Sequence, residues 1–372
     1  MSLMPGVAAG KRAAPAGRAY GEAADFTYIP SLDGVRALAV LIVMLSHFGL
    51  ERVVPGAFGV TVFFFVSGFI ITRLLLAEYA KNGRVSVATF YLRRFWRLVP
   101  ALVAMIGVTA ALAYATSGTI NLPEICAGLF YYTNYYDAFG GTITMPLAPL
   151  WSLAVEEHYY LLYGLAFAVF WPLRRVWPGV VAVLGAVLVW RLVVILGLGG
   201  VAGGIDTDES YVHFATDTRL DSILYGAVLA IALEFPDLRG RLRALDSYPV
   251  VAAAFAGLLI GFAWRNGVFR GTFRYTLQGV SLLPLFYVAM FGTQFYWARR
   301  VLEHPALRWT GKLSYSLYLW NLPALVMVAD LFPSQSPTVH YALAWPASFA
   351  LAAASYYWVE QPGRRMRQRL RP

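Results

Sequence analysis

The sequence predicts an all-α fold: a polytopic membrane helix bundle of about ten transmembrane helices, with both termini in the cytoplasm. Of the 372 residues, 59% are hydrophobic and only 13% are charged. A soluble domain has about 45–50% apolar and about 25% charged residues, so a buried core alone does not explain the excess. Apolar runs long enough to cross a bilayer recur along the chain, and basic residues fill alternate connections between them. We therefore expect a multi-pass protein of the cell (inner or plasma) membrane, embedded in the lipid bilayer.

The apolar runs follow one another, and no connection is long enough to hold a second soluble domain. They lie at 33–50, 57–79, 96–116, 149–172, 177–198, 218–235, 248–265, 276–296, 313–332 and 339–359. The segment 123–137 is apolar and aromatic but short, which predicts a re-entrant or interfacial piece. We expect one membrane domain over residues 28–362, a flexible cytoplasmic tail at 1–27 and a basic cytoplasmic tail at 363–372.

The basic residues predict the orientation of these helices. Lys and Arg gather in the connections at 80–97, 173–176, 236–247 and 297–312 and at the C-terminus, whereas 117–148 and 199–217 have none. Cytoplasmic connections are enriched in Lys and Arg, so the alternation predicts that both termini are inside. One connection, 266–275, does not follow this pattern, because it is basic but would lie outside. Most of the net charge of +10 then reflects topology, and we expect no nucleic-acid partner.

Three ionisable side chains lie in the first apolar run, where lipid would penalise them. Arg36 and His47 are eleven residues apart. That spacing is about three turns plus roughly 20°, so both lie on one helix face about 16 Å apart. Asp33 precedes Arg36 by one turn and can pair with it, or both can simply anchor the helix end. Histidine is well suited to proton transfer near neutral pH, which makes His47 a candidate catalytic base.

Arg93, Arg94 and Arg97 lie at the expected cytoplasmic start of the third apolar run. Spacings of three and four put Arg97 on one side of the helix with Arg94 or Arg93. These arginines either anchor the helix under the positive-inside rule or form a fork for phosphate groups, which a guanidinium binds in bidentate fashion. A phosphate-bearing substrate arriving from the cytosol would meet this cluster first.

Two further polar clusters interrupt apolar runs. Glu156 and Glu157 point about 100° apart on a helix, so they cannot serve one site equally, and a buried ion pair and a catalytic role both stay open. Tyr315 and Asn321 lie in a polar, aromatic stretch that either binds neighbouring helices or lines a ligand pocket.

Other unusual residues of the apolar runs have structural interpretations. Arg219 and Asp221 begin the sixth run and predict an interhelical salt bridge. Small residues in the second run predict the close approach of a neighbouring helix. These are Gly56, Gly59, Ser67 and Gly68.

Over about residues 28 to 362, the chain resembles the integral-membrane acyltransferases of acyltransferase family 3. Seven segments in the same order carry the resemblance: "SLDGVRALAVLIVMLSH", "GVTVFFFVSGFIIT", "YLRRFWRLVPAL", "PLWSLAVEEHYYLL", "TRLDSILYGAVLA", "LSYSLYLWN" and "WVEQP". The family's motif of an arginine, ten residues and a histidine falls on Arg36 and His47. Its arginine motif falls on Arg94 and Arg97, with Arg93 adjacent.

Two positions depart from the family's pattern. The family's glutamates after "WSL" fall on Glu156 and Glu157, but His158 then stands where many members have Gln. Asn321 stands where many members have His, which puts a role for histidine in that helix in doubt.

The resemblance implies an enzyme that transfers an acyl group other than aminoacyl, commonly acetyl, from cytosolic acyl-CoA to a hydroxyl of a carbohydrate or glycosylated acceptor. It implies that Arg93, Arg94 and Arg97 hold the phosphates of acetyl-CoA. His47 would act as base or acyl carrier in a catalytic group with Arg36, Glu156 and Glu157. We expect Asp33, Tyr315 and Asn321 to contact substrate.

Several partners and one competing function stay open at this point. The single cysteine, Cys126, excludes an intrachain disulfide and a cysteine-based metal cluster, and we expect no metal. A homo-oligomer or a polysaccharide-assembly partner is compatible with the sequence. A polytopic transporter or flippase of a lipid-linked or small glycoside would also have many spans, although such proteins often contain repeated halves that this sequence lacks.

Overall fold

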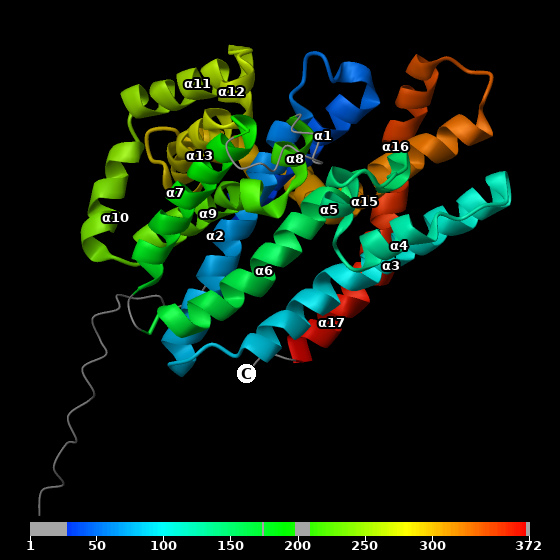
Figure 1. Cartoon of the computed structure of the whole chain (residues 1–372). Helices are drawn as coiled ribbons and strands as arrows, with labels where there is room; N and C mark the ends of the chain where they lie inside the picture. Colours follow the sequence, from blue (N-terminus) through cyan, green and yellow to red (C-terminus); the bar gives the residue numbers. More distant parts are fainter. Residues whose placement is uncertain (1–27, 173–174, 198–208, 370–372) are drawn as a thin grey trace, which may run out of the picture.

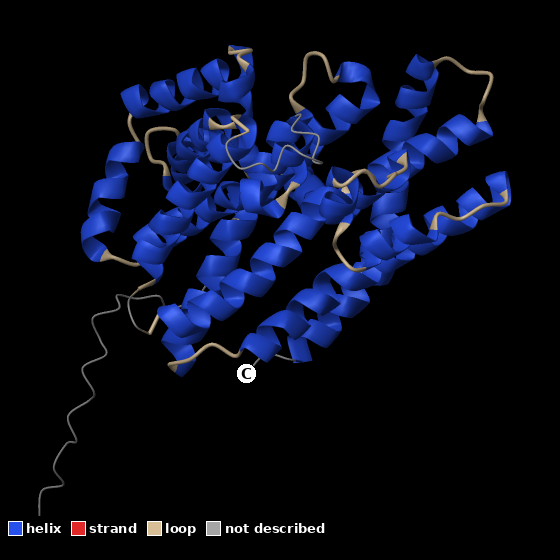
Figure 2. Ribbon diagram, in the orientation of Figure 1, coloured by secondary structure: helices blue, strands red, loops and turns tan. Residues whose placement is uncertain are grey.

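A computed structural model describes residues 28–172, 175–197 and 209–369. Within these ranges the chain is built from helices joined by short loops, and no strand is found there (Figure 2). The prediction of an all-α fold is therefore confirmed. The tail expected at 1–27 and the last three residues of the tail expected at 363–372 lie outside the described residues.

All ten apolar runs lie on long helices. These are α1 Pro30–Leu45, α2 Gly56–Asn82, α3 Val87–Ser117, α6 Leu150–Phe170, α7 Val176–Ile195, α9 Thr216–Ala232, α11 Tyr248–Ala263, α13 Phe273–Phe291, α15 Pro305–Leu331 and α16 Pro337–Ser355. Short helices lie in the connections and at the end: α4 Leu122–Leu129, α5 Thr133–Ala138, α8 Glu209–Phe214, α10 Pro236–Leu242, α12 Gly267–Gly271, α14 Tyr296–Leu302 and α17 Gln361–Arg369. The short apolar segment 123–137 thus forms α4 and α5 rather than one continuous helix.

The apolar helices are those of a membrane protein. Four helices in the described part are long and apolar enough to cross a bilayer, and two bent helix pairs raise this number to six. The bent pairs are α10 with α11 and α13 with α14. Others are short for a span, such as α9 with 17 residues. The expected ten crossings and the orientation of the termini therefore stay predictions.

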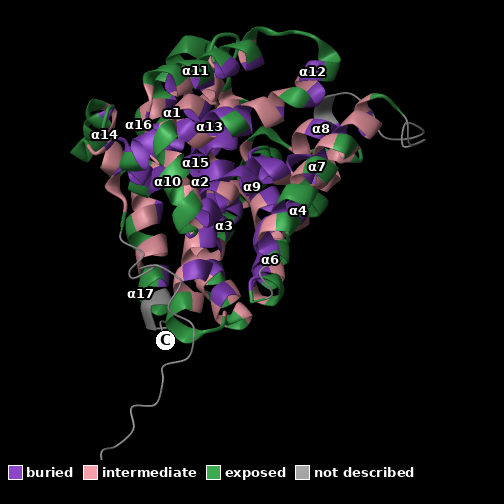
Figure 3. Ribbon diagram, turned by 90° about the vertical axis from the view of Figure 1, so that its left-hand side faces the viewer, coloured by how far each residue is buried: buried purple, intermediate pink, exposed green. Residues whose placement is uncertain are grey.

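The centre of the bundle is formed by α1 and α2, which pack against each other. The other main contacts join α2 to α9, α1 to α15 and α15 to α16. A side chain on Gly68 would place its Cβ 1.9 Å from the carbonyl oxygen of Ile223, and Gly59 is similarly close to Ala39. The small residues of α2 thus permit close helix contact, as predicted for its glycines. Figure 3 shows the buried residues gathered along these inner helices.

Two π-helical turns interrupt otherwise regular helices, and π-helical turns are frequent at functional sites. The first, Ser46–Leu50, extends α1 and carries His47. The helical geometry breaks inside this turn at Gly49, whose φ of 85° favours glycine, and a Cβ there would strike the ring of Tyr341. The second, Tyr356–Glu360, links α16 to α17. α17 and the junction of α2 with α3 lie at the same end of the bundle, at the bottom of Figure 1.

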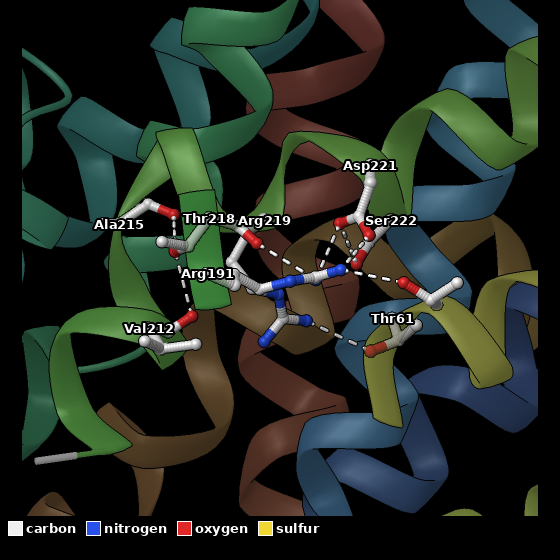
Figure 4. A network of polar contacts seen from close by, with 9 residues as sticks. Thr61, Arg191, Val212, Ala215, Thr218, Arg219, Asp221 and Ser222 are labelled. Atoms are coloured by element: carbon white, nitrogen blue, oxygen red, sulfur yellow. Dashed lines mark hydrogen bonds and ion pairs between the residues drawn. The ribbon is translucent and has the colours of Figure 1, made fainter. Parts of the chain in front are cut away.

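A buried polar network ties α7, α9 and α2 together (Figure 4). Arg191 of α7 donates to Asp221 of α9 at 2.7 Å, and both side chains are buried. Arg219 instead donates to the hydroxyl of Thr61 at 3.1 Å and lies over the ring of Tyr275 at 4.2 Å. The predicted interhelical salt bridge is confirmed for Asp221, with Arg191 as its partner.

Candidate active site

A large cavity, which we call the vestibule, opens between the start of α1, the first turns of α3, α15 and the C-terminal segment. Its volume is about 490 Å³. Six basic residues line it: Arg36, Arg93, Arg94, Arg97, Lys312 and Arg364. Three acidic residues line it as well: Asp33, Glu78 and Glu360. Positive charge is therefore in excess, as a site for an anion requires.

The acidic residues hold two of the arginines in place. Arg93 pairs with Glu78 at 3.5 Å, and Glu78 also accepts the backbone N–H of Ser86 at 2.8 Å. Arg36 pairs with Asp33 at 3.7 Å, as the spacing of one turn predicts. Asp33 additionally accepts the hydroxyl of Tyr28. These contacts fix the guanidinium groups at the wall of the vestibule.

Arg94 is held differently from its neighbours. Its side chain is buried, with 7% of the residue exposed. Its guanidinium lies 5.7 Å from the ring centre of Phe90 and 5.5 Å from that of Tyr160. Aromatic faces attract a cation, so these two rings help to position the guanidinium of Arg94.

A second, smaller cavity, which we call the inner cavity, continues the vestibule into the bundle. Its volume is about 60 Å³. The two cavities share five lining residues, Arg36, Ile70, Arg94, Arg97 and Tyr315. The hydroxyl of Tyr315 donates to the carbonyl of Leu98 at 2.8 Å, which fixes this ring at the junction. A molecule that reached the inner cavity through the vestibule would therefore pass the arginines.

One face of α2 forms the apolar wall of the inner cavity. The spacing of three and four residues along a helix brings these side chains together. They are the apolar Val60, Phe63, Phe64, Val66, Ile70 and Ile71, with the hydroxyl of Ser67 among them. The opposite wall is more polar and comes from α6 and α15. It contains Ser152, Glu156, Tyr160, Ser314 and Tyr318.

Glu156 is the acidic side chain of the inner cavity. It accepts the hydroxyl of Ser67 at 2.7 Å and that of Tyr160 at 3.2 Å. Ser67 was predicted to permit close helix contact, and the structure adds that it lines the inner cavity and that its hydroxyl bonds Glu156. Glu157 lines neither cavity and lies where the charge of Arg94 acts on it. The two neighbouring glutamates thus diverge as the helix geometry predicts.

His47 is bonded to Asn321, 274 positions away along the chain. Its Nδ1 lies 2.6 Å from the Oδ1 of Asn321. The amide nitrogen of Asn321 donates to the carbonyls of Leu317 at 3.0 Å and Tyr318 at 2.7 Å. The amide orientation is therefore fixed, so Oδ1 is the acceptor and Nδ1 of His47 carries the proton. Nε2 is then left with its lone pair, as a general base requires.

His47 lies beyond the inner cavity and does not line it. Tyr318 lines that cavity, and Asn321 follows it on α15 by three residues, about 5 Å along the helix. The hydroxyl of Tyr318 is hydrogen-bonded to Ser152 at 2.6 Å and to the carbonyl of Pro149 at 2.9 Å. The vestibule, the inner cavity and His47 therefore follow one another along the bundle.

The sequence predictions can now be compared with these positions. Asp33, Arg36, Arg93, Arg94, Arg97 and Tyr315 all line the vestibule, and Glu156 lines the inner cavity. His158 bonds Thr216 at 2.7 Å and lines neither cavity. Four charged vestibule residues were not singled out for a site: Glu78, Lys312, Glu360 and Arg364. Glu360 belongs to the segment "WVEQP" and accepts the hydroxyl of Ser316, so that segment was the available signal.

Comparison with known proteins identifies the family of this chain. Residues 29–358 match the model of a family described as an acyltransferase domain. The chain belongs to this family. Among the residues that the structure describes, no group of three metal-ligating side chains is found.

Relatives with curated names are O-acetyltransferases. The peptidoglycan O-acetyltransferase OatA of Listeria monocytogenes is 31% identical over 376 residues, which covers 91% of this chain and 56% of the relative. The O-acetyltransferase OatA of Staphylococcus aureus is 32% identical over 353 residues, which covers 91% of this chain and 57% of the relative. The chain thus spans little more than half the length of the curated relatives it matches. No solved structure matches it.

Proposed function

We propose that this protein is a multi-pass O-acyltransferase of the cell membrane. It moves an acyl group, acetyl in the first instance, from acyl-CoA to a hydroxyl of a carbohydrate or glycosylated acceptor. The observation that carries the proposal is the sequence of three sites along one path. A basic vestibule leads into a small cavity, and a histidine with a free Nε2 lone pair lies one turn of α15 beyond it.

The vestibule binds the nucleotide end of the donor. Coenzyme A carries several phosphate charges, and arginine matches phosphate oxygens with paired N–H groups. Arg93 and Arg97 lie one turn apart on α3, and Lys312 and Arg364 approach from other elements. The excess of six basic over three acidic side chains supports an anionic ligand. The volume of the vestibule, about 490 Å³, lies within the range of about 300–1,000 Å³ that is usual for ligand pockets.

His47 removes the proton from the acceptor hydroxyl through Nε2. The hydroxyl oxygen attacks the thioester carbonyl, the C–S bond breaks, and the proton then passes from His47 to the thiolate of coenzyme A. Asn321 is a positioning residue in this step, because its amide is bonded on three sides within the protein and fixes the tautomer of His47. General-base assistance of this kind contributes roughly 10²–10⁴-fold.

Arg36 and Glu156 act at the junction between the two cavities. Arg36 lines both, so its charge reaches the part of the donor that enters the bundle. We assign it to donor binding first and to the developing oxyanion second. Glu156 keeps Ser67 and Tyr160 in place along the path of the acyl group.

The test is acyl transfer by the purified full chain, with acetyl-CoA labelled in the acetyl group and a panel of glycans that includes peptidoglycan fragments. His47→Ala should lower transfer by at least about 100-fold while leaving binding of acetyl-CoA intact. The matched control is His158→Ala, which removes a histidine that lines neither cavity. Transfer by His47→Ala at the normal rate would overturn the assignment. Label retained on the protein in the absence of acceptor would indicate that His47 carries the acyl group itself.

The proposal also assigns the vestibule to the cytoplasmic side. The basic connection 80–97 and α17 lie at that end of the bundle (Figure 1). Because Cys126 is the only cysteine, a Cys126→Ser background permits single cysteines to be placed at Asn82 and Asn121. An impermeant maleimide should label Asn121→Cys in intact cells and Asn82→Cys only after lysis. The reverse pattern would contradict this orientation.

A further inference from the structure

We propose that the inner cavity is the acyl-binding pocket and that Phe63 limits the length of the acyl chain this enzyme accepts. This inference rests on the proposed function, because it assumes that an acyl-CoA occupies the vestibule. Phe63 would then determine which acyl-chain lengths the enzyme accepts from its donor. Phe63 lines the inner cavity together with Tyr318, at the end that leads toward His47.

The size of the inner cavity favours a short acyl group. One water-sized group needs roughly 10–15 Å³ of such space, so a cavity of about 60 Å³ holds about four to six of them. An acetyl thioester has about four non-hydrogen atoms and fits, whereas a hexanoyl thioester has about eight and does not. The vestibule, at about 490 Å³, is about eight times larger than the inner cavity, at about 60 Å³. The limit on acyl-chain length therefore lies in the inner cavity.

The walls of the inner cavity match the two ends of an acyl thioester. Arg36 and Arg97 line the junction with the vestibule, where the arm of the donor would enter. Ser152 and Tyr318 of the polar wall would face the thioester carbonyl near the end that leads toward His47. Val60, Phe63 and Leu153 supply apolar surface beside it for the methyl group. The acceptor cannot use the same space, because the donor fills it from the vestibule side.

Phe63 is held against a rigid neighbour. Its ring packs edge-to-face on Tyr318 with ring centres 6.1 Å apart. Tyr318 is in turn fixed by Ser152 and the carbonyl of Pro149. A longer chain would therefore have to displace a packed pair of rings, and overpacking of this kind is costly.

Phe64 also lines the cavity but is a poorer choice for a test. It is only 1% exposed and packs edge-to-face on Trp151, and Arg219 lies 5.5 Å from its ring centre. Shortening Phe64 would disturb the buried arginine network as well as the cavity. Phe63 is half-buried and borders the cavity without touching that network.

The test measures displacement of labelled acetyl-CoA from the purified full chain by CoA, acetyl-CoA, butyryl-CoA and hexanoyl-CoA. For the wild-type protein, hexanoyl-CoA should bind at least about tenfold more weakly than acetyl-CoA. Phe63→Ala should reduce that difference at least about fivefold, and Phe63→Leu should do so to a smaller extent. The matched control is Phe58→Ala on the same helix, which removes a half-buried ring that packs on Phe262 and lines neither cavity.

The outcomes separate this inference from the proposed function. CoA carries no acyl group, so its binding reports the vestibule alone. If CoA does not bind to the wild-type protein, the proposed donor is wrong. If CoA binds and the wild-type protein does not distinguish acetyl from hexanoyl, only the inference about Phe63 is overturned. The same holds if Phe63→Leu, the milder change, binds CoA normally but leaves the chain-length difference unchanged.

Discussion

Two regions of this protein are rich in arginine, and they use it in opposite ways. In the vestibule, six basic side chains surround a cavity of about 490 Å³ with only three acidic ones. In the network of α7 and α9, Arg191 and Arg219 have 0% exposure (Figure 4). Arg191 is neutralised by Asp221, and Arg219 is surrounded by rings and neutral acceptors. The vestibule thus has excess positive charge next to a cavity, whereas the network of α7 and α9 encloses its arginines among packed side chains.

The difference teaches how a buried charge in a membrane protein can be interpreted. An ionisable group within a membrane segment is a candidate functional residue by default, and both regions satisfy that rule. Only the vestibule also has the volume that a ligand needs. The hydrogen bonds of the buried network join helices to one another, so we assign this network a structural role. This assignment leads to predictions that separate the two regions.

The largest effect is expected when the buried pair is broken. Asp221→Ala leaves Arg191 enclosed without its carboxylate, which should cost about 3–5 kcal/mol of stability. Glu78→Ala is the matched control, because it removes the partner of Arg93 at the wall of the vestibule. Thermal unfolding of the purified proteins should show a large loss for Asp221→Ala and a loss of about 1 kcal/mol or less for Glu78→Ala. Equal losses would remove the distinction between the two regions.

A smaller effect, on binding rather than stability, is expected in the vestibule. Arg97→Ala should weaken the binding of acetyl-CoA by about 10- to 100-fold, since a hydrogen bond to a charged group contributes about 1.5–3 kcal/mol. The melting temperature should stay close to that of the wild-type protein. Arg365→Ala is the control, because it removes one exposed positive charge of α17 that does not line the vestibule. An unchanged affinity in Arg97→Ala defeats the phosphate-binding role.

The elements of the fold could be predicted because apolar runs of spanning length rarely form anything but helices in a membrane. The run at 313–332 lies on α15, although that helix begins earlier, at Pro305. The first two turns of α15 are polar, so the apolar run does not reveal where the helix begins. A proline is nevertheless favourable in the first turn of a helix. The vestibule arginines could also be predicted, since Arg93, Arg94 and Arg97 are close in sequence and share a helix.

The contacts that connect distant positions could not be predicted. The bond from His47 to Asn321 joins α1 to α15, and no local pattern reports which helices will be neighbours. Asn321 was a departure from the family's pattern, yet its amide contacts the histidine of α1. Gly68 lies in a close helix contact, and the small Ser67 beside it was assigned the same role. Ser67 also faces the cavity. Adjacent helix residues point about 100° apart, so packing alone decides such cases.

Removing a negative charge from the vestibule should have the opposite sign to removing a positive one. Glu360→Gln keeps an acceptor for the hydroxyl of Ser316 but removes a charge that would repel phosphate. Binding of acetyl-CoA should become about two- to fivefold tighter at low salt, because a charge at the wall of a water-filled cavity acts on the ligand with about 1 kcal/mol or less. Glu303→Gln, outside the vestibule, is the control. Weaker binding in Glu360→Gln would mean that the carboxylate itself contacts the donor.

The smallest effect concerns a carboxylate that is stabilised without any arginine. Asp246, in the turn between α10 and α11, accepts the N–H and hydroxyl of Thr293 at 2.7 and 2.8 Å and the N–H of Gln294 at 3.2 Å. Burial alone would raise the pKa of Asp246, but these hydrogen bonds outweigh it and hold the pKa below its ordinary value. The ionised form is therefore favoured by folding. Its contribution to stability is present above the unfolded pKa of about 3.9 and is lost as the pH falls through the lower, folded pKa.

Asp246→Asn should therefore lower the stability by about 0.5–1.5 kcal/mol at pH 6, and the difference from the wild-type protein should shrink below about pH 4. Melting temperatures of both proteins between pH 6 and pH 3.5 measure this difference. Binding of acetyl-CoA should not change, because Asp246 lines neither the vestibule nor the inner cavity. A stability difference that stays constant over the whole range would show that Asp246 contributes through packing and not through its charge. A loss of donor binding would place this turn with the vestibule, on the functional side of the comparison.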